Sequence, residues 1–135
     1  MAGYSGTPLA KKLGIRPGVR LHTIDAPAEY PGWLAPLPED VTFEARGGEA
    51  NCHVVHIFVG SLTALRHALP KARRTVSTTG AIWVSWHKKS SGIPTDVTEN
   101  AVRDLALRTD LVDVKVCAVT EIWSGLKLVI RKHLR

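Results

Sequence analysis

The chain has 135 residues, of which 44% are hydrophobic and 22% are charged. This length suits one domain with a single core, and the composition excludes wholesale disorder. The two cysteines are too few for a disulfide framework, and no apolar run approaches the roughly twenty residues that span a bilayer. We therefore expect one domain over residues 1–135, without a secretory leader or a membrane partner, in the cytoplasm.

The net charge of +6 is unevenly distributed. Residues 1–50 contain five Lys or Arg against six Asp or Glu, residues 51–100 six against two, and residues 101–135 seven against four. A basic C-terminal part favours an anionic partner such as a nucleotide, a phosphorylated metabolite or a nucleic acid. The alternative is a solvated basic surface that serves solubility.

Cap and turn residues define the first elements. Thr7 and Pro8 predict the start of a short helix, which Gly14 ends. A strand is predicted over 19–24, after a Pro-Gly turn. Four prolines and a glycine between residues 25 and 40 argue against regular structure there, and a short strand is expected over 41–45.

The middle of the chain predicts alternating strands and helices. The β-branched run 53–59 has the length of a buried strand, and Ser61 is a candidate N-cap for the helix that follows. Pro70 predicts a break or kink in this helix, with a restart to about Val76. A second buried strand is predicted over 81–86, followed by a loop over 87–95.

The last third predicts a helix and a hairpin. Asp96 and Glu99 have the spacing of a capping box and predict a helix that runs to about Arg108. Residues 112–119 alternate as a strand does, and 126–130 form the final strand. Ser124 and Gly125 lie in the connection, so the two strands are expected to pair antiparallel.

This order predicts the fold. The central strand–helix–strand–helix–strand stretch implies right-handed crossovers and parallel pairing, and the closing hairpin adds one antiparallel strand. We therefore expect a three-layer α/β, Rossmann-like domain with a six-stranded, mostly parallel sheet whose final strand is antiparallel.

The closing pattern resembles the C-terminal half of the class I S-adenosylmethionine methyltransferases, whose Rossmann-like sheet has an antiparallel strand inserted between its neighbours. The chain also resembles a family of short bacterial proteins of unassigned function, a domain-of-unknown-function family. The matching segments are residues 4–15 (YSGTPLAKKLGI), 16–20 (RPGVR), 83–99 (WVSWHKKSSGIPTDVTE) and 111–131 (LVDVKVCAVTEIWSGLKLVIR). The resemblance implies a reduced methyltransferase-like fold and no particular activity.

The residues after the first strand do not suit the cofactor of that fold. Dinucleotide and S-adenosylmethionine sites need glycines there, which let the backbone approach the ligand. Here the strand is followed by Asp25 and the tripeptide Ala-Pro-Ala, so we expect no cofactor. His53 and His56 are three residues apart in one strand and face opposite ways, so we expect no metal site either.

Several polar segments are expected at the carboxyl ends of the parallel strands, where ligands bind in such sheets. Two lysines beside a helix N-terminus suit a phosphate or carboxylate, and a Ser-Ser-Gly linker could close over it. The alternative is a solvated loop in which Asp96 already caps the helix. The residues of this candidate anion cleft are Asp25, Lys88, Lys89, Asp96, Glu121, Trp123 and Ser124.

The tryptophans have different expected roles. Trp83 is expected in the core, and Trp86 on the opposite face of the sheet. Trp123, in a connection beside Gly125, is the one of the three most expected to be partly exposed, and it is the first candidate for stacking on a ligand. Cys52 and Cys117 are expected to be free thiols, because no secretory feature is visible and one of the two cysteines lies on an apolar strand.

Three functions remain open at this point. The first is a non-catalytic Rossmann-like module that binds a small anionic ligand or a protein partner. The second is an enzyme of unknown reaction that acts on a small anionic metabolite, a degenerate methyltransferase, with Asp25, Lys88, Lys89 or Glu121 as its polar groups. The third, less favoured, is a nucleic-acid-binding adaptor that uses the basic clusters at 71–74 and 131–135.

Overall fold

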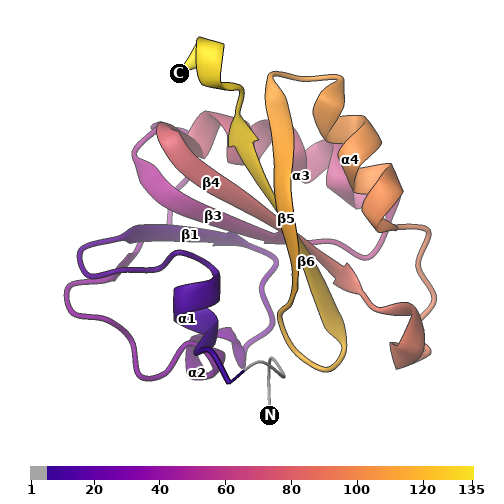
Figure 1. Ribbon diagram of the computed structural model, residues 1–135, viewed down its shortest axis with the longest axis horizontal. Coiled ribbons are helices and arrows are strands. Elements are labelled where there is room, and N and C mark those ends of the chain that lie inside the picture. Colours follow the sequence, from indigo (N-terminus) through magenta and orange to yellow (C-terminus); the bar gives the residue numbers. More distant parts are fainter. Residues whose placement is uncertain (1–5) are drawn as a thin grey trace.

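The computed structural model describes residues 6–135, in which six strands form one sheet with helices on both faces (Figure 1). The strands are β1 (Arg20–Ile24), β2 (Thr42–Phe43), β3 (Cys52–Phe58), β4 (Val76–His87), β5 (Leu111–Ala118) and β6 (Trp123–Ile130). The helices are α1 (Leu9–Lys12), α2 (Tyr30–Trp33), α3 (Leu62–Thr75) and α4 (Glu99–Leu107), with 3-10 turns at Lys89–Ser91 and Lys132–Leu134. None of the helices described is long and apolar enough to cross a membrane.

The sheet order is β2-β1-β3-β4-β6-β5. The pairs of β1 with β2, of β1 with β3 and of β3 with β4 are parallel, whereas β6 pairs antiparallel with β4 on one side and β5 on the other. The predicted fold is therefore confirmed, including the antiparallel final strand. The parallel strands follow from two crossover helices, each of which returns the chain to the same edge of the sheet. The tight hairpin then adds the antiparallel strand.

Two apolar cores lie on the two faces of the sheet. One lies under α3 and α4 and includes Trp86. The other lies under α1 and α2 and includes Trp83, whose indole Nε1–H donates to the Leu13 carbonyl at 3.0 Å. The predicted separation of Trp83 and Trp86 is thus confirmed, because residues three apart in a strand face opposite ways.

The structure corrects several predicted boundaries. Helix α3 runs unbroken through Pro70, because one lost backbone bond on an exposed turn is outweighed by the buried face that includes Leu65, Leu69 and Ala72. The proline-rich segment 25–40 contains one helical turn, α2, which buries Tyr30. Strand β4 begins at Val76 rather than at 81, and β6 begins at Trp123 rather than at 126, because cross-strand pairing extends both.

Candidate ligand-binding site

The carboxyl end of β4 and the start of β6 lie side by side, as predicted. His87 is the register partner of Trp123, and Trp86 is the partner of Ser124. The Lys88 backbone N–H donates to the Ile122 carbonyl at 2.8 Å. The lysine loop and the closing hairpin therefore meet at one edge of the sheet, which confirms the geometric prediction for these two segments.

Of the two lysines of this loop, only Lys89 lines the pocket on the α4 side. Lys89 and Ser124 line a pocket of about 540 Å³ on the α4 side, together with Trp86, Thr98 and other residues of the loop. Lys88 is not among the residues that line this pocket. Only Lys89 and Ser124 of the predicted cleft therefore share this pocket, and their role in anion binding stays a prediction.

Asp96 caps a different helix from the one predicted. Its Oδ1 accepts a hydrogen bond from the Leu62 backbone N–H at 2.9 Å, at the N-terminus of α3. The N-cap of α4 is Thr98, whose hydroxyl accepts from the Ala101 N–H at 3.1 Å. A carboxylate of the protein thus lies where an anionic ligand of the α3 N-terminus would bind. Because Asp96 and Leu62 are 34 residues apart, no local sequence pattern indicates this hydrogen bond.

Asp25 and Glu121 do not join the lysine loop in a common cavity. Asp25 lines a separate pocket of about 610 Å³ with Lys71 and Arg74, on the α3 side of β1. Glu121 is exposed in the turn between β5 and β6. The seven predicted residues are therefore spread over both faces and the edge of the sheet.

Trp123 is buried rather than partly exposed, since only 9% of its surface is accessible. Its ring stacks on His87, with the centroids 3.9 Å apart, and meets Phe58 edge-on at 5.0 Å. Tyr30 and Trp33 of α2 also pack against Phe58, with ring centroids 5.4 and 6.3 Å away. These four aromatic residues, Tyr30, Trp33, Phe58 and Trp123, form an aromatic plug on the α1 side of the sheet.

The described residues do not fit S-adenosylmethionine at the place where the fold would bind it. Asp25, not glycine, occupies the left-handed turn after β1, with φ of 57°, and a proline follows two residues later. The next helix, α2, has only four residues, and it contributes the plug residues Tyr30 and Trp33. The glycine turn and the helix that opens on it are thus both missing here.

A buried chain of hydrogen bonds lies beside the plug. The Tyr30 hydroxyl is 2.8 Å from His56 Nδ1, and His56 Nε2 is 2.7 Å from the Ser85 hydroxyl. Burial lowers the pKa of His56 to about 3 and raises that of Tyr30. A Ser–His pair can act in nucleophilic catalysis, but both side chains are fully buried, so this chain of bonds holds the core together.

Both cysteines are free thiols, as predicted. Burial is the largest effect on the pKa of Cys52 and of Cys117, and it raises both above the ordinary value. Neither thiol therefore has the lowered pKa of an activated nucleophile. Among residues 6–135, no group of three or more His, Cys, Asp and Glu side chains could hold a metal ion.

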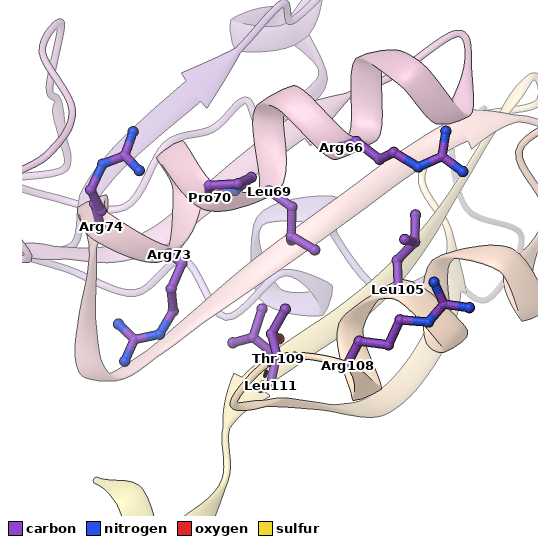
Figure 2. A pocket seen from close by; sticks show the side chains of 9 residues that line it. All are labelled: Arg66, Leu69, Pro70, Arg73, Arg74, Leu105, Arg108, Thr109 and Leu111. Atoms are coloured by element: carbon purple, nitrogen blue, oxygen red, sulfur yellow. Dashed lines mark hydrogen bonds between the residues drawn. The ribbon is translucent and has the colours of Figure 1, made fainter.

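A groove between α3 and α4 has the strongest positive charge of the three pockets described here (Figure 2). It measures about 450 Å³. Its apolar lining comes from Leu69 and Pro70 of α3, from Leu105 in the last turn of α4 and from Leu111 at the start of β5. The arginines that line it are Arg66, Arg73, Arg74 and Arg108. We call this cavity the arginine groove.

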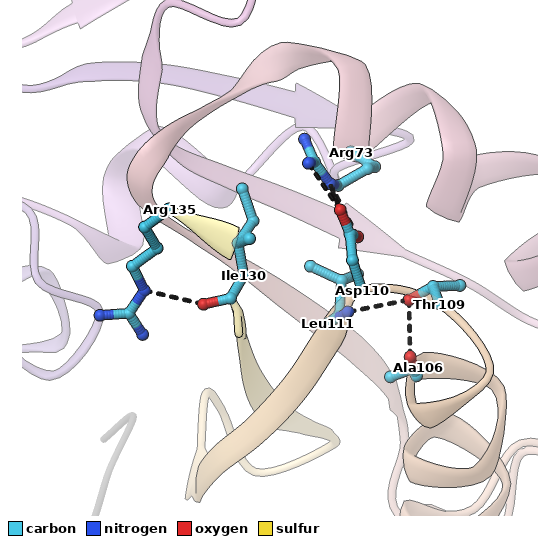
Figure 3. Close-up of polar contacts among 7 residues, drawn as sticks. All are labelled: Arg73, Ala106, Thr109, Asp110, Leu111, Ile130 and Arg135. Atoms are coloured by element: carbon cyan, nitrogen blue, oxygen red, sulfur yellow. Dashed lines mark hydrogen bonds and ion pairs between the residues drawn. The ribbon is translucent and has the colours of Figure 1, made fainter. Parts of the chain in front are cut away.

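The two ends of the arginine groove differ in charge. At one end Arg73 donates to the Asp110 carboxylate from Nε and Nη2, at 2.9 to 3.0 and 2.7 Å (Figure 3). These bonds hold the pKa of Asp110 below its ordinary value. Arg66 and Arg108 extend toward the other end (Figure 2), and within residues 6–135 neither forms an ion pair.

The turn after α4 positions Asp110 for this contact (Figure 3). The Thr109 hydroxyl donates to the Ala106 carbonyl at 2.6 Å and accepts from the Leu111 N–H at 3.1 Å. The basic cluster at 71–74 was visible in the sequence, but Arg66 and Arg108 stood apart from it. Only the packing of α3 beside α4 brings them together, and no local pattern indicates that packing.

Comparisons with known proteins show the fold. No protein-family model matches the sequence, and no match was found among curated proteins. A protein of Sulfolobus solfataricus, provisionally described as a type 11 methyltransferase, superposes with a TM-score of 0.65 at 13% identity, over 98% of this chain and 95% of that one. The Bacillus subtilis M1A22 tRNA methyltransferase TrmK gives 0.61 at 10% identity, over 92% and 65%.

Two other similar structures contain SAH or are named as SAM-dependent enzymes. A complex of the protein DhpI with SAH has a TM-score of 0.63 at 9% identity, over 91% of this chain and 82% of that one. A SAM-dependent O-methyltransferase of Thermotoga maritima gives 0.57 at 9% identity, over 92% and 64%. The structural neighbours of the present chain are thus S-adenosylmethionine-dependent methyltransferases, and this chain has a methyltransferase-like fold.

Proposed function

We propose that this chain is a non-catalytic module of methyltransferase-like fold that binds a small anionic ligand in the arginine groove. The observation that carries the proposal is the pair Arg66 and Arg108, which lie on facing helices beside an apolar floor and lack an ion-pair partner in the described residues. Guanidinium groups in this arrangement favour a carboxylate, phosphate or sulfonate.

The shape of the groove suggests which end of a ligand lies where. An anionic head placed between Arg66 and Arg108 would leave its apolar body on Leu69 and Leu105. The Arg73–Asp110 pair, already neutralised, closes the far end. A volume of about 450 Å³ falls within the range of small-molecule sites. The ligand class that fits is therefore a small amphipathic monoanion.

Decanoate is a suitable probe for this site. We expect it to shift the amide resonances of α3 and α4 in an NMR titration, whereas decanol, of equal length and no charge, should bind at least about tenfold more weakly. Charge-assisted hydrogen bonds typically contribute about 1.5–3 kcal/mol, which corresponds to a factor of roughly ten or more in affinity. Equal binding of decanoate and decanol would contradict the anion-directed part of the proposal.

Two double variants test whether decanoate binds in the arginine groove. Arg66→Gln combined with Arg108→Gln should weaken decanoate at least about tenfold, because both side chains that face the head group lose their charge. Arg16→Gln combined with Lys115→Gln removes the same charge from the other side of the sheet and should leave the affinity unchanged. If both double variants weaken decanoate equally, net charge rather than the arginine groove accounts for the binding.

A separate prediction concerns the cofactor of the similar structures. We expect S-adenosylmethionine and S-adenosylhomocysteine to give no saturable heat in calorimetry at ligand concentrations up to the high micromolar range. The reason is that Asp25 and Pro27 replace the glycine turn and that the plug residue Tyr30 is buried beside it. A sub-micromolar dissociation constant for either compound would contradict the proposal that this chain is a non-catalytic module.

A further inference from the structure

Two lysines lie directly opposite each other on the strand pair at the edge of the sheet. Lys115 of β5 is the register partner of Lys127 of β6. Partners in an antiparallel pair project to the same face with their Cβ atoms about 4.5–5.5 Å apart, and like charges at that spacing are destabilising. Within the described residues neither lysine forms an ion pair. An anion between them would remove the repulsion.

A β-bulge creates this pairing. Asp113 is the partner of Leu128, and two residues later Lys115 is the partner of Lys127, so β5 contains one extra residue. Asp113 accordingly faces α4, where Arg103 Nε donates to its carboxylate at 2.9 Å. In a regular strand Lys115 would face the same way, but the extra residue turns it to the α1 side. The positive charge of this face is thus a consequence of the irregular register.

Further positive charges act on this part of the sheet. Burial, followed by the charges of Lys115 and Arg16, holds the pKa of Lys127 below its ordinary value. The charged groups that act on the adjacent Cys117 are Lys12, Lys115 and Lys88, all positive. We call the surface formed by Lys12, Arg16, Lys115 and Lys127 the basic sheet face.

The basic sheet face lies at an open edge. Strand β5 is the last strand of the sheet, and α3 and α4 pack on its opposite side (Figure 1). On the face of β5 away from these helices Lys115 is exposed, and its register partner Lys127 is half-buried. An extended chain could therefore pass along β5 beside α1, which contributes Lys12.

We propose that the basic sheet face binds the phosphate backbone of a single-stranded polynucleotide. Closely spaced cations on an open strand edge match a chain that carries one phosphate per nucleotide. The aromatic residues on the same side are packed into the plug, so the contact is made through phosphates and is independent of base sequence. The proposal does not depend on the arginine groove, which lies on the other side of the sheet.

Fluorescence anisotropy with a labelled twelve-nucleotide single-stranded RNA tests this. If about three phosphates are contacted, raising the salt from about 50 to about 200 mM should weaken binding roughly 20-fold. Arg16→Gln combined with Lys115→Gln should weaken binding at low salt by about tenfold or more. Arg66→Gln combined with Arg108→Gln removes equal charge elsewhere and should have little effect.

Three readouts make the test decisive. Lys115→Gln alone should be at least as resistant to urea as the parent protein, because it removes the like-charge pair, so its weaker binding cannot be ascribed to unfolding. Lys115→Arg should retain most of the binding. Equal loss in the two double variants, or equally tight binding of poly-glutamate and RNA, would overturn the proposal.

Discussion

The protein should lose stability steeply as the pH falls from about 6.5, and His56 is the reason. The imidazole is fully buried between Tyr30 and Ser85 and stacks on Phe58, with the ring centroids 4.4 Å apart. Because burial disfavours the charged form, the pKa of His56 in the folded protein is lowered to about 3. In the unfolded chain the same group titrates near its ordinary value of about 6.5.

The direction of the effect follows from proton binding. Between these two pKa values the unfolded chain binds a proton that the folded protein does not. The stabilisation is fully present above pH 6.5 or so and is lost as the pH falls toward 3, by about 1.4 kcal/mol per pH unit. Asp110 and Asp113, whose pKa values are lowered by Arg73 and Arg103, contribute only at lower pH, near the carboxyl range.

Urea denaturation at pH 7.5, 6.5, 5.5 and 4.5 measures this. We expect the free energy of unfolding to fall by about 2–3 kcal/mol between pH 6.5 and 4.5 in the parent protein. His56→Gln can keep hydrogen bonds to both hydroxyls but cannot titrate, so its stability should be nearly flat over that interval. His53→Gln, at an exposed position of the same strand, should retain the parent slope. A parent protein equally stable at both pH values would contradict the assignment.

Trp83→Ala should cost about 3–5 kcal/mol, a large part of the roughly 5–15 kcal/mol that stabilises a typical domain. Trp83 is fully buried between the sheet and α1, and its ring lies 3.3 Å from the position that a Cβ on Gly125 would occupy. Its removal leaves a cavity in the core that holds α1. The Leu13 carbonyl also loses the indole N–H that it accepts at 3.0 Å.

Two further variants separate the packing from the hydrogen bond. Trp83→Phe keeps most of the ring but leaves the Leu13 carbonyl unpaired, so we expect a smaller loss of about 1–3 kcal/mol. Trp33→Ala, at a half-buried position on the same side of the sheet, should cost less than Trp83→Ala. Hydrogen exchange should show loss of protection concentrated in α1 for Trp83→Ala. Unchanged protection of α1 would show that Trp83 does not anchor it.

The candidate sites show which features local sequence patterns predict and which they do not. The sequence correctly indicated that Lys88 and the start of β6 meet at one edge, because parallel crossovers determine at which end each strand emerges. It could not indicate that only Lys89 of the two lysines lines a pocket with Ser124, or that Trp123 is covered by Phe58 and His87. Those outcomes depend on side chains from distant segments competing for the same space.

The amino-acid sequence by itself determined the order of strands and helices, the antiparallel closing hairpin and the opposite orientation of Trp83 and Trp86. These features follow from periodicity, caps and crossover handedness, which act over a few residues or are common to all such sheets. The tertiary structure alone decided that Asp96 caps α3, that Arg66 and Arg108 line one groove, and that a bulge turns Lys115 toward Lys127. The first two outcomes join residues far apart in the chain, and the third depends on a register shift. Long-range contacts and strand register are decided by the packing of whole elements rather than by local preference.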